Sequence, residues 1–249
     1  MELQYKEYGN KDSGLLICFL HGGGVSGWMW QEQINYFQSY HCLVPDLPEH
    51  GASKDCSPFS IRFSAESIIK IIENIAPSKK IAIIGFSLGA QVVIEILSLK
   101  PNFAHYAIIN SPLVVPMRWM KKYIPLTIKL SYPLVQNRLF AKIQARTLYI
   151  KENQFETYFQ ETRQIKVDTF IRVLEENMSY QIPPNFHLAK GKILITVGEK
   201  EKKIMKQSKD LLLEANPNIE GMVIPNIGHG ISLAKPAYFN ELIVKWLGL

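Results

Sequence analysis

The chain has 249 residues, 47% of them hydrophobic and 20% charged, a balance that excludes a disordered or fibrous protein. Its 28 basic and 22 acidic residues give a formal charge of +6, and so small an excess does not by itself indicate nucleic acid binding. The polar residues 1–14 lack the pattern of a secretory signal, and the run Leu15–Leu20 is too short to cross a bilayer. Cys18, Cys42 and Cys56 cannot all pair and lack metal-ligand spacing, so we expect reduced thiols and a cytoplasmic location.

Short apolar runs alternate with longer amphipathic segments in the first half of the chain, which is typical of a parallel α/β sheet. The apolar runs are too short for helices and predict buried strands over residues 15–20, 41–44, 80–85, 105–109, 192–197 and 221–224. Apolar residues at helical spacing predict helices over 64–76, with Ser64 as its N-cap, and over 88–100 and 236–247.

Residues 113–187 interrupt this alternation. They contain no clear strand pattern and are punctuated by prolines, so we expect a helical cap (lid) inserted between two parts of an α/β core, residues 1–112 and 188–249. The span from Leu113 to Ile150 has no Asp or Glu and has seven basic residues, namely Arg118, Lys121, Lys122, Lys129, Arg138, Lys142 and Arg146.

A G-x-S-x-G pentapeptide, Gly85-Phe86-Ser87-Leu88-Gly89, joins a predicted strand to a predicted helix. In this context the turn holds the serine in a strained conformation with its hydroxyl exposed, and the glycines let strand and helix approach each other. The helix N-terminus adds free N–H groups and a positive dipole end. We therefore predict that Ser87 is a nucleophile rather than part of an ordinary glycine-bounded turn.

A serine hydroxyl needs a base near neutral pH, and His229 is the predicted base. It lies in a short glycine-flanked loop after the predicted strand 221–224, where α/β folds assemble their sites. A carboxylate must orient the imidazole, and both Glu199 and Glu201 follow the predicted strand 192–197. We favour Glu201 because it lies further into the loop; the alternative interpretation is a solvated charged loop.

Three successive glycines follow His21 at the end of the first long strand and can bring a backbone N–H close to a bound carbonyl. The N–H groups of Gly23 and Leu88 form the predicted oxyanion hole, with Gly24 as an alternative donor. Nucleotide binding is not favoured, since neither a following Lys-Ser/Thr nor the G-x-G-x-x-G spacing is present.

Together these motifs resemble the α/β-hydrolase superfamily over nearly the whole chain outside the cap: His21-Gly22-Gly23-Gly24, Asp46-Leu47-Pro48-Glu49-His50-Gly51-Ala52-Ser53, Gly85-Phe86-Ser87-Leu88-Gly89 and Gly228-His229. The resemblance implies the α/β-hydrolase fold, with a mostly parallel eight-stranded sheet flanked by helices and a helical cap inserted after the sixth strand. It also implies a triad of Ser87, His229 and an acid that works without a cofactor or a metal.

Two positions depart from the family pattern. Glu49 replaces a glycine of D-L-P-G-H-G-x-S, which is expected to reshape that loop. Glu201 stands where the family usually has aspartate, and its extra methylene shifts the carboxylate. The family's alternative acid position falls near Asn110-Ser111-Pro112 and offers no carboxylate, which favours Glu201.

These features predict a serine hydrolase that cleaves a carboxylester-type bond of a small molecule through an acyl-enzyme, with no nucleic acid partner. Serine at position 87 disfavours the dehalogenase and epoxide-opening relatives, which need aspartate there. Cleavage of a carbon–carbon bond, thioester, amide or lipid stays open. A ligand-sensing or regulatory protein with a slow or idle triad is the alternative from another class.

Substrate contacts are predicted at Gly24, Trp28 and Phe86, although Trp28 and Trp30 are equally compatible with packing roles. In the cap, apolar and basic residues are interleaved. They form either a surface that contacts anionic lipid or a lid whose apolar face packs on the core while its lysines are solvated. We favour the packed lid, with membrane contact as the alternative.

Overall fold

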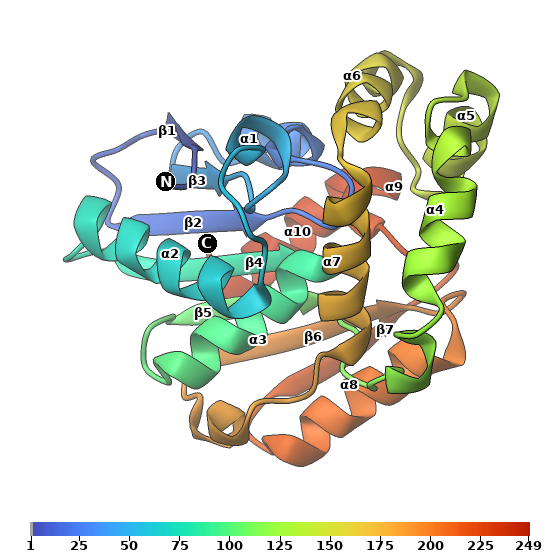
Figure 1. Ribbon diagram of the computed structural model, residues 1–249. Helices are drawn as coiled ribbons and strands as arrows, with labels where there is room; N and C mark the ends of the chain where they lie inside the picture. Colours follow the sequence, from blue (N-terminus) through green and yellow to red (C-terminus); the bar gives the residue numbers. More distant parts are fainter. Residues whose placement is uncertain (1) are drawn as a thin grey trace.

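The computed structural model describes residues 2–249 and contains a sheet between two helical layers (Figure 1). The strand order is β1-β3-β2-β4-β5-β6-β7. Only the β1–β3 pair is antiparallel, and every other described pair is parallel. The strands are β1 Tyr5–Gly9, β2 Leu15–Leu20, β3 His41–Pro45, β4 Lys80–Phe86, β5 Tyr106–Asn110, β6 Lys192–Gly198 and β7 Glu220–Ile224.

The mostly parallel sheet is confirmed, but the expected count of eight strands is wrong, because the described residues form seven. The strand β1 lies at the edge, where its residues are exposed or half-buried, so it lacks the apolar run that marks a buried strand.

Both faces of the sheet are buried, as β2 shows. Leu16, Cys18 and Leu20 join one apolar cluster with helices α2 (Ile61–Ile75), α3 (Leu88–Leu99) and α8 (Lys203–Ala215). The alternate residues Leu15, Ile17 and Phe19 join the other cluster with α1 (Gln31–Tyr36) and α10 (Pro236–Leu247). This two-sided burial explains why β2 is continuously apolar rather than alternating. No helix among residues 2–249 combines the length and apolarity needed to cross a membrane.

The N-cap of α2 differs from the prediction. Ser60, not Ser64, accepts the capping hydrogen bond, from the N–H of Phe63 at 3.0 Å. The Ser64 hydroxyl instead lies one turn into the helix and donates to the carbonyl of Ser60 at 2.7 Å. Ile61, the first residue of α2, is buried on the same side as Ile68, so the buried stripe begins one turn earlier than the prediction placed it.

Between β5 and β6 the regular elements are all helices; the longer ones gather beyond the carboxyl ends of the parallel strands, and the last short one lies at their amino ends (Figure 1). They are the short η3 (Arg118–Met120), α4 (Ile124–Val135), α5 (Arg138–Thr147), α6 (Glu152–Gln164), α7 (Val167–Ser179) and the short η4 (Pro184–Leu188). The helical character expected of residues 113–187 is therefore present, and these residues are called the cap segment below.

Glu49 ties the cap segment to the core. Its carboxylate accepts two hydrogen bonds from Arg172 of α7, at 2.9 and 3.0 Å, and others from Ser57, the N–H of Phe59 and Thr169. Burial raises the pKa of Glu49, but these donors outweigh that effect and leave the pKa below its ordinary value. Its φ of 62° explains why glycine suits this position in the family.

We expect Glu49→Gln to lower the free energy of unfolding by about 2 kcal/mol at neutral pH, because the charged hydrogen bonds to Arg172 are lost. Since the pKa of Glu49 is depressed in the folded state, its contribution is present above the unfolded-state pKa and disappears as pH falls through the folded-state pKa. Denaturant titrations of both proteins at neutral and acidic pH measure this difference.

The matched control is Glu156→Gln, which removes an exposed Glu–Arg pair with Arg138 and should leave stability almost unchanged. Equal destabilisation by both variants, or a Glu49→Gln effect that persists in acid, would contradict the assigned role of Glu49.

Candidate active site

Ser87 lies at a sharp bend between β4 and α3, with φ 53° and ψ −110°. Two glycines make the bend feasible. A Cβ on Gly85 would lie 2.4 Å from the carbonyl oxygen of Gly89, and a Cβ on Gly89 would lie 2.3 Å from that of Leu20. The Ser87 N–H donates to the carbonyl of Asn110 at 2.9 Å, which fixes the bend against β5. A positive φ in a serine is strained, and the close packing of strand and helix maintains it.

A cavity of about 340 Å³ lies next to Ser87. Its core side consists of Gly23, Gly24, Ser87 and Leu88. Its cap side is mainly apolar, with a few polar groups, and is contributed by α4, α5 and α7: Ile128, Ser131, Tyr132, Val135, Phe140, Gln144, Phe170, Val173, Leu174 and Asn177. A small apolar cavity with few polar groups is typical of a site for a small organic molecule.

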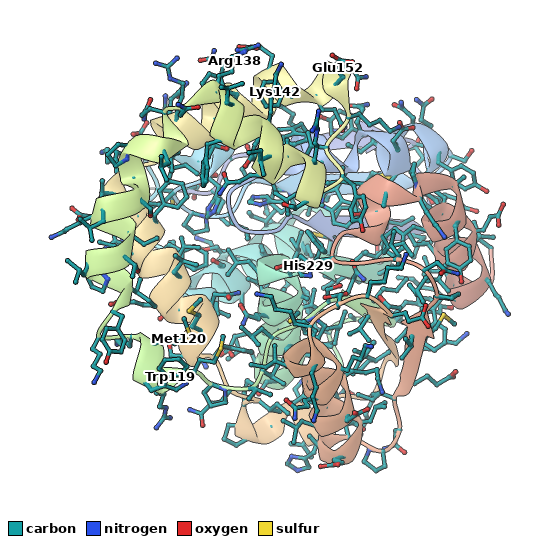
Figure 2. The ribbon with its side chains drawn as sticks, turned by 90° about the vertical axis from the view of Figure 1, so that its right-hand side faces the viewer. Trp119, Met120, Arg138, Lys142, Glu152 and His229 are labelled. Atoms are coloured by element: carbon teal, nitrogen blue, oxygen red, sulfur yellow. The ribbon has the colours of Figure 1, made fainter. Side chains whose placement is uncertain are left out.

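His229 and Glu201 are hydrogen-bonded to each other. The Nδ1 of His229 lies 2.9 Å from Oε2 of Glu201, whose side chain is almost fully buried. Figure 2 shows His229 in the middle of the face that lies between the cap segment and the C-terminal helices. Burial raises the pKa of Glu201, but hydrogen bonds from His229, Gly198 and Ser111 outweigh it, so the net pKa is lowered. Glu201 is therefore ionised at neutral pH and can orient the imidazole.

Ser87 and His229 come from neighbouring parts of the site. The ring of Phe86, the residue before Ser87, packs on the His229 ring with centroids 4.7 Å apart. No hydrogen bond joins the Ser87 hydroxyl to His229 within residues 2–249. In proteins without substrate such catalytic contacts are often long and shorten only on binding.

Of the two acid candidates, only Glu201 contacts His229. The carboxylate of Glu199 accepts from the N–H of Asn226 at 2.8 Å and fixes the loop that leads to His229. The Glu201 carboxylate also accepts from the hydroxyl of Ser111 at 2.7 Å and from the N–H of Gly198 at 2.8 Å.

Sequence reasoning missed the role of Ser111. This buried residue, with φ 55°, follows β5 at the family's alternative acid position. The segment was noted only because it offers no carboxylate. The signal that its side chain could reach the acid was its position directly after β5, the strand that pairs with β6.

The predicted oxyanion donors both line the cavity. Leu88 is the first residue of α3, so its N–H has no partner in the preceding turn. The N–H of Gly23 makes no hydrogen bond within the described part of the chain. A Cβ on Gly23 would lie 3.7 Å from Val173 of α7, which brings this cap helix close to the predicted hole.

Only one of the three predicted substrate contacts lies at the cavity. Gly24 lines the cavity, whereas Trp28 and Phe86 do not. The indole N–H of Trp28 donates to Glu161 of α6 at 2.7 Å, which makes Trp28 a contact between core and cap segment. Trp30 is fully buried among the aromatic residues of the core.

The other motif residues hold the loops around the site. Nε2 of His21 accepts from the N–H of Leu47 at 2.9 Å, and burial lowers the pKa of His21, so its ring is neutral. The Asp46 carboxylate accepts from the N–H groups of Gly27 and Ala52, both at 2.8 Å. These bonds join the glycine-rich turn to the loop that contains Glu49.

The loop with His229 also touches the cap segment. The N–H of Gly228 donates to the hydroxyl of Tyr149 at 3.2 Å, just beyond the end of α5. Among the described residues, no group of three or more His, Cys, Asp or Glu side chains is arranged to hold a metal ion.

Comparisons with known proteins agree with this fold. Carboxylesterase YbfK of Bacillus subtilis is 24% identical over 96% of this chain and 82% of its own length. An AB hydrolase superfamily protein of Gibberella zeae is 30% identical over 36% of this chain, a match that spans only 32% of that protein. A lipase-esterase related protein from Clostridium acetobutylicum superposes with a TM-score of 0.78 at 21% identity, covering 99% of this chain and 100% of that one. That structure supports the fold alone.

The alpha/beta hydrolase family model matches residues 19–242, and the chain therefore belongs to the alpha/beta hydrolase family. The family and its esterase-like members bear out the expectation of a hydrolase.

We expect Ser111→Ala to raise the pKa of Glu201, because a donor to the ionised carboxylate is removed. Carbon-13 NMR titration of the glutamate carboxyl groups, with Glu201 assigned by substitution, measures the shift. Ser208→Ala replaces another buried serine, which bonds to Val114 and Ile204 instead, and should leave that titration unchanged. An unaltered Glu201 titration in Ser111→Ala would exclude this contribution.

Proposed function

We propose that the protein is a serine hydrolase that cleaves a small-molecule carboxylic ester through an acyl-enzyme on Ser87. His229 takes the hydroxyl proton as Ser87 attacks the carbonyl carbon, and Glu201 stabilises the imidazolium. The N–H groups of Gly23 and Leu88 stabilise the oxyanion. His229 then protonates the departing alcohol, and water, activated by the same imidazole, releases the acid and restores Ser87.

The observation that carries this proposal is the hydrogen-bonded pair of Glu201 and His229, whose imidazole packs on Phe86 next to Ser87, a residue that lines the cavity. An isolated buried carboxylate would favour its neutral form, so its ionisation depends on the donors around it. A strained serine, a tautomer-fixing carboxylate and free backbone N–H groups are the parts that acyl transfer requires.

The cavity supports a substrate with a small or medium acyl group. Its volume of about 340 Å³ is at the lower end of the range for small-molecule sites. Its apolar side chains come mostly from the cap segment, so we propose that residues 113–187 form the cap that selects the acyl group, over a core of residues 1–112 and 188–249. The similarity to carboxylesterase YbfK favours an ester over the other acyl derivatives.

We expect a fluorophosphonate probe to label the wild-type protein once, as detected by intact mass, and not to label Ser87→Ala. Turnover of a chromogenic short-chain ester should fall about 10⁴-fold in Ser87→Ala, because the nucleophile is lost. Ser208→Ala is the matched control, since it removes a buried hydroxyl that bonds to Val114 and Ile204 instead and should retain labelling.

Labelling of Ser87→Ala at the wild-type level would refute the nucleophile assignment. A folded wild type that neither reacts with the probe nor turns over esters would favour the ligand-sensing alternative over a hydrolase.

Glu201→Gln should lower kcat by about 10²- to 10⁴-fold in a protein that still folds, because an amide no longer fixes the His229 tautomer or stabilises its charge. Glu199→Gln makes the same chemical change two residues away and should retain turnover. A large loss in Glu199→Gln with none in Glu201→Gln would reverse the assignment of the acid.

A further inference from the structure

The most exposed large apolar side chains of the described chain gather on the cap segment. Leu130 is 74% exposed, Leu139 73% and Trp119 68%, and no large apolar residue outside the cap segment reaches these values. They belong to a set called here the outer cap face: Trp119, Tyr123, Leu126, Leu130, Leu134, Leu139 and Ile143. Such a cluster on one surface is typical of an interaction site.

The exposed apolar residues form one stripe on each helix. On α4, Leu126, Leu130 and Leu134 recur every four residues and so lie on one side of the helix, and Leu139 and Ile143 do the same on α5. Other sides of both helices line the cavity near Ser87: Ile128 lies across α4 from the leucine stripe, and Phe140 lies next to Leu139 on α5, about 100° round the helix. Each helix therefore has two apolar sides, of which only one is covered by protein.

This exposure departs from the expectation of a packed lid. Ile124, Ala141 and Ala145 do pack inward and are buried. The leucines of the outer cap face do not, because the helices are already in contact with the cavity and with α6 and α7 on their inner side. An apolar stripe left in water needs another partner to be covered.

The segment that carries the outer cap face is positively charged. All seven basic residues between Leu113 and Ile150 are exposed, and no acidic residue occurs in that span. Within the described residues only Arg138 among them forms an ion pair, with Glu156 of α6 at 2.6 Å. Figure 2 shows Trp119 at one end of the cap segment and Arg138 and Lys142 at the other, all at the rim of the molecule, away from His229.

We propose that the outer cap face docks on an anionic lipid surface. The leucines and Trp119 enter the boundary between headgroups and acyl chains, and the lysines and arginines pair with anionic headgroups. A second copy of the chain is disfavoured because a symmetric contact would oppose two basic surfaces. A nucleic acid would use the charge but would leave the leucines without a role.

Docking in this orientation brings the cavity next to the lipid, since the same helices form both. An amphiphilic substrate partitioned into the surface would then have a short path to Ser87. The docking proposal itself does not depend on the proposed hydrolysis, and its experiments measure binding.

The first experiment is vesicle flotation of the full chain at low ionic strength. We expect binding to phosphatidylcholine vesicles that contain one third phosphatidylglycerol, little binding to phosphatidylcholine alone, and release as salt is raised. Added anionic vesicles should also shift tryptophan emission to shorter wavelength. Trp119→Phe should abolish that shift, because the other three tryptophans are buried or half-buried already.

Two double variants test the apolar and the electrostatic components of vesicle binding separately. Leu130→Ser/Leu139→Ser removes apolar insertion, and Lys129→Glu/Lys142→Glu reverses charge; each should weaken binding to the anionic vesicles at least about tenfold. The matched controls lie outside the cap segment: Leu211→Ser/Val223→Ser, which are also exposed, and Lys190→Glu/Lys245→Glu. These controls should bind as the wild type does. None of the four variants alters a residue of the cavity, so turnover of a soluble ester should persist in all of them.

Failure of the wild type to bind anionic vesicles overturns the proposal, as does equal weakening by the control variants. A stable wild-type dimer that Leu130→Ser/Leu139→Ser dissociates would assign the face to a second copy instead. Retention on heparin without vesicle binding would assign its charge to a polyanion. A wild type that binds vesicles but hydrolyses no ester would refute the proposed function and retain the docking proposal.

Discussion

The bend at Ser87 is the constraint on which the rest of the site depends. A serine with a positive φ costs about 1–3 kcal/mol locally, and that cost is maintained because the buried strand β4 and the helix α3 allow no other path for the chain. The two flanking glycines are required because a Cβ at either position would collide with a carbonyl oxygen, not because the chain must be flexible there. The same bend exposes the hydroxyl, starts α3 at Leu88 and so leaves a free N–H beside the cavity.

Much of the core could be predicted from the sequence because its elements are buried on both sides. Continuous apolar runs identified six strands, and the motifs at their ends identified residues that lie at one edge of the sheet. The strand β1 was missed because an exposed edge strand has no such run. The helix α8 was hidden in a charge-rich segment, where only a narrow side of the helix is buried.

The residues of the site likewise differ in how far the sequence reveals them. Residues fixed by backbone geometry, such as Ser87 and the glycines, carry local sequence signals. Contacts between distant segments do not, so the bonds from Ser111 to Glu201 and from Trp28 to Glu161 became visible only in three dimensions. The exposure of the cap leucines is another case, since amphipathic spacing reveals an apolar side but not whether protein covers it.

Glu49 shows how a departure from a family pattern can be compensated. The backbone at this position keeps the left-handed conformation that suits glycine, and the side chain gains five hydrogen bonds, two of them from Arg172. The strained backbone conformation is kept, and the side chain compensates for it with a contact between segments far apart in the sequence.

The hydroxyl of Tyr149 gives the loop around His229 a second anchor. That loop follows β7 at one end, and the N–H of its Gly228 donates to the hydroxyl of Tyr149 in the cap segment. A displacement of the α5 end that kept this bond would carry the imidazole with it. The Tyr149–Gly228 hydrogen bond thus couples the position of the His229 loop to the end of a helix that lines the cavity.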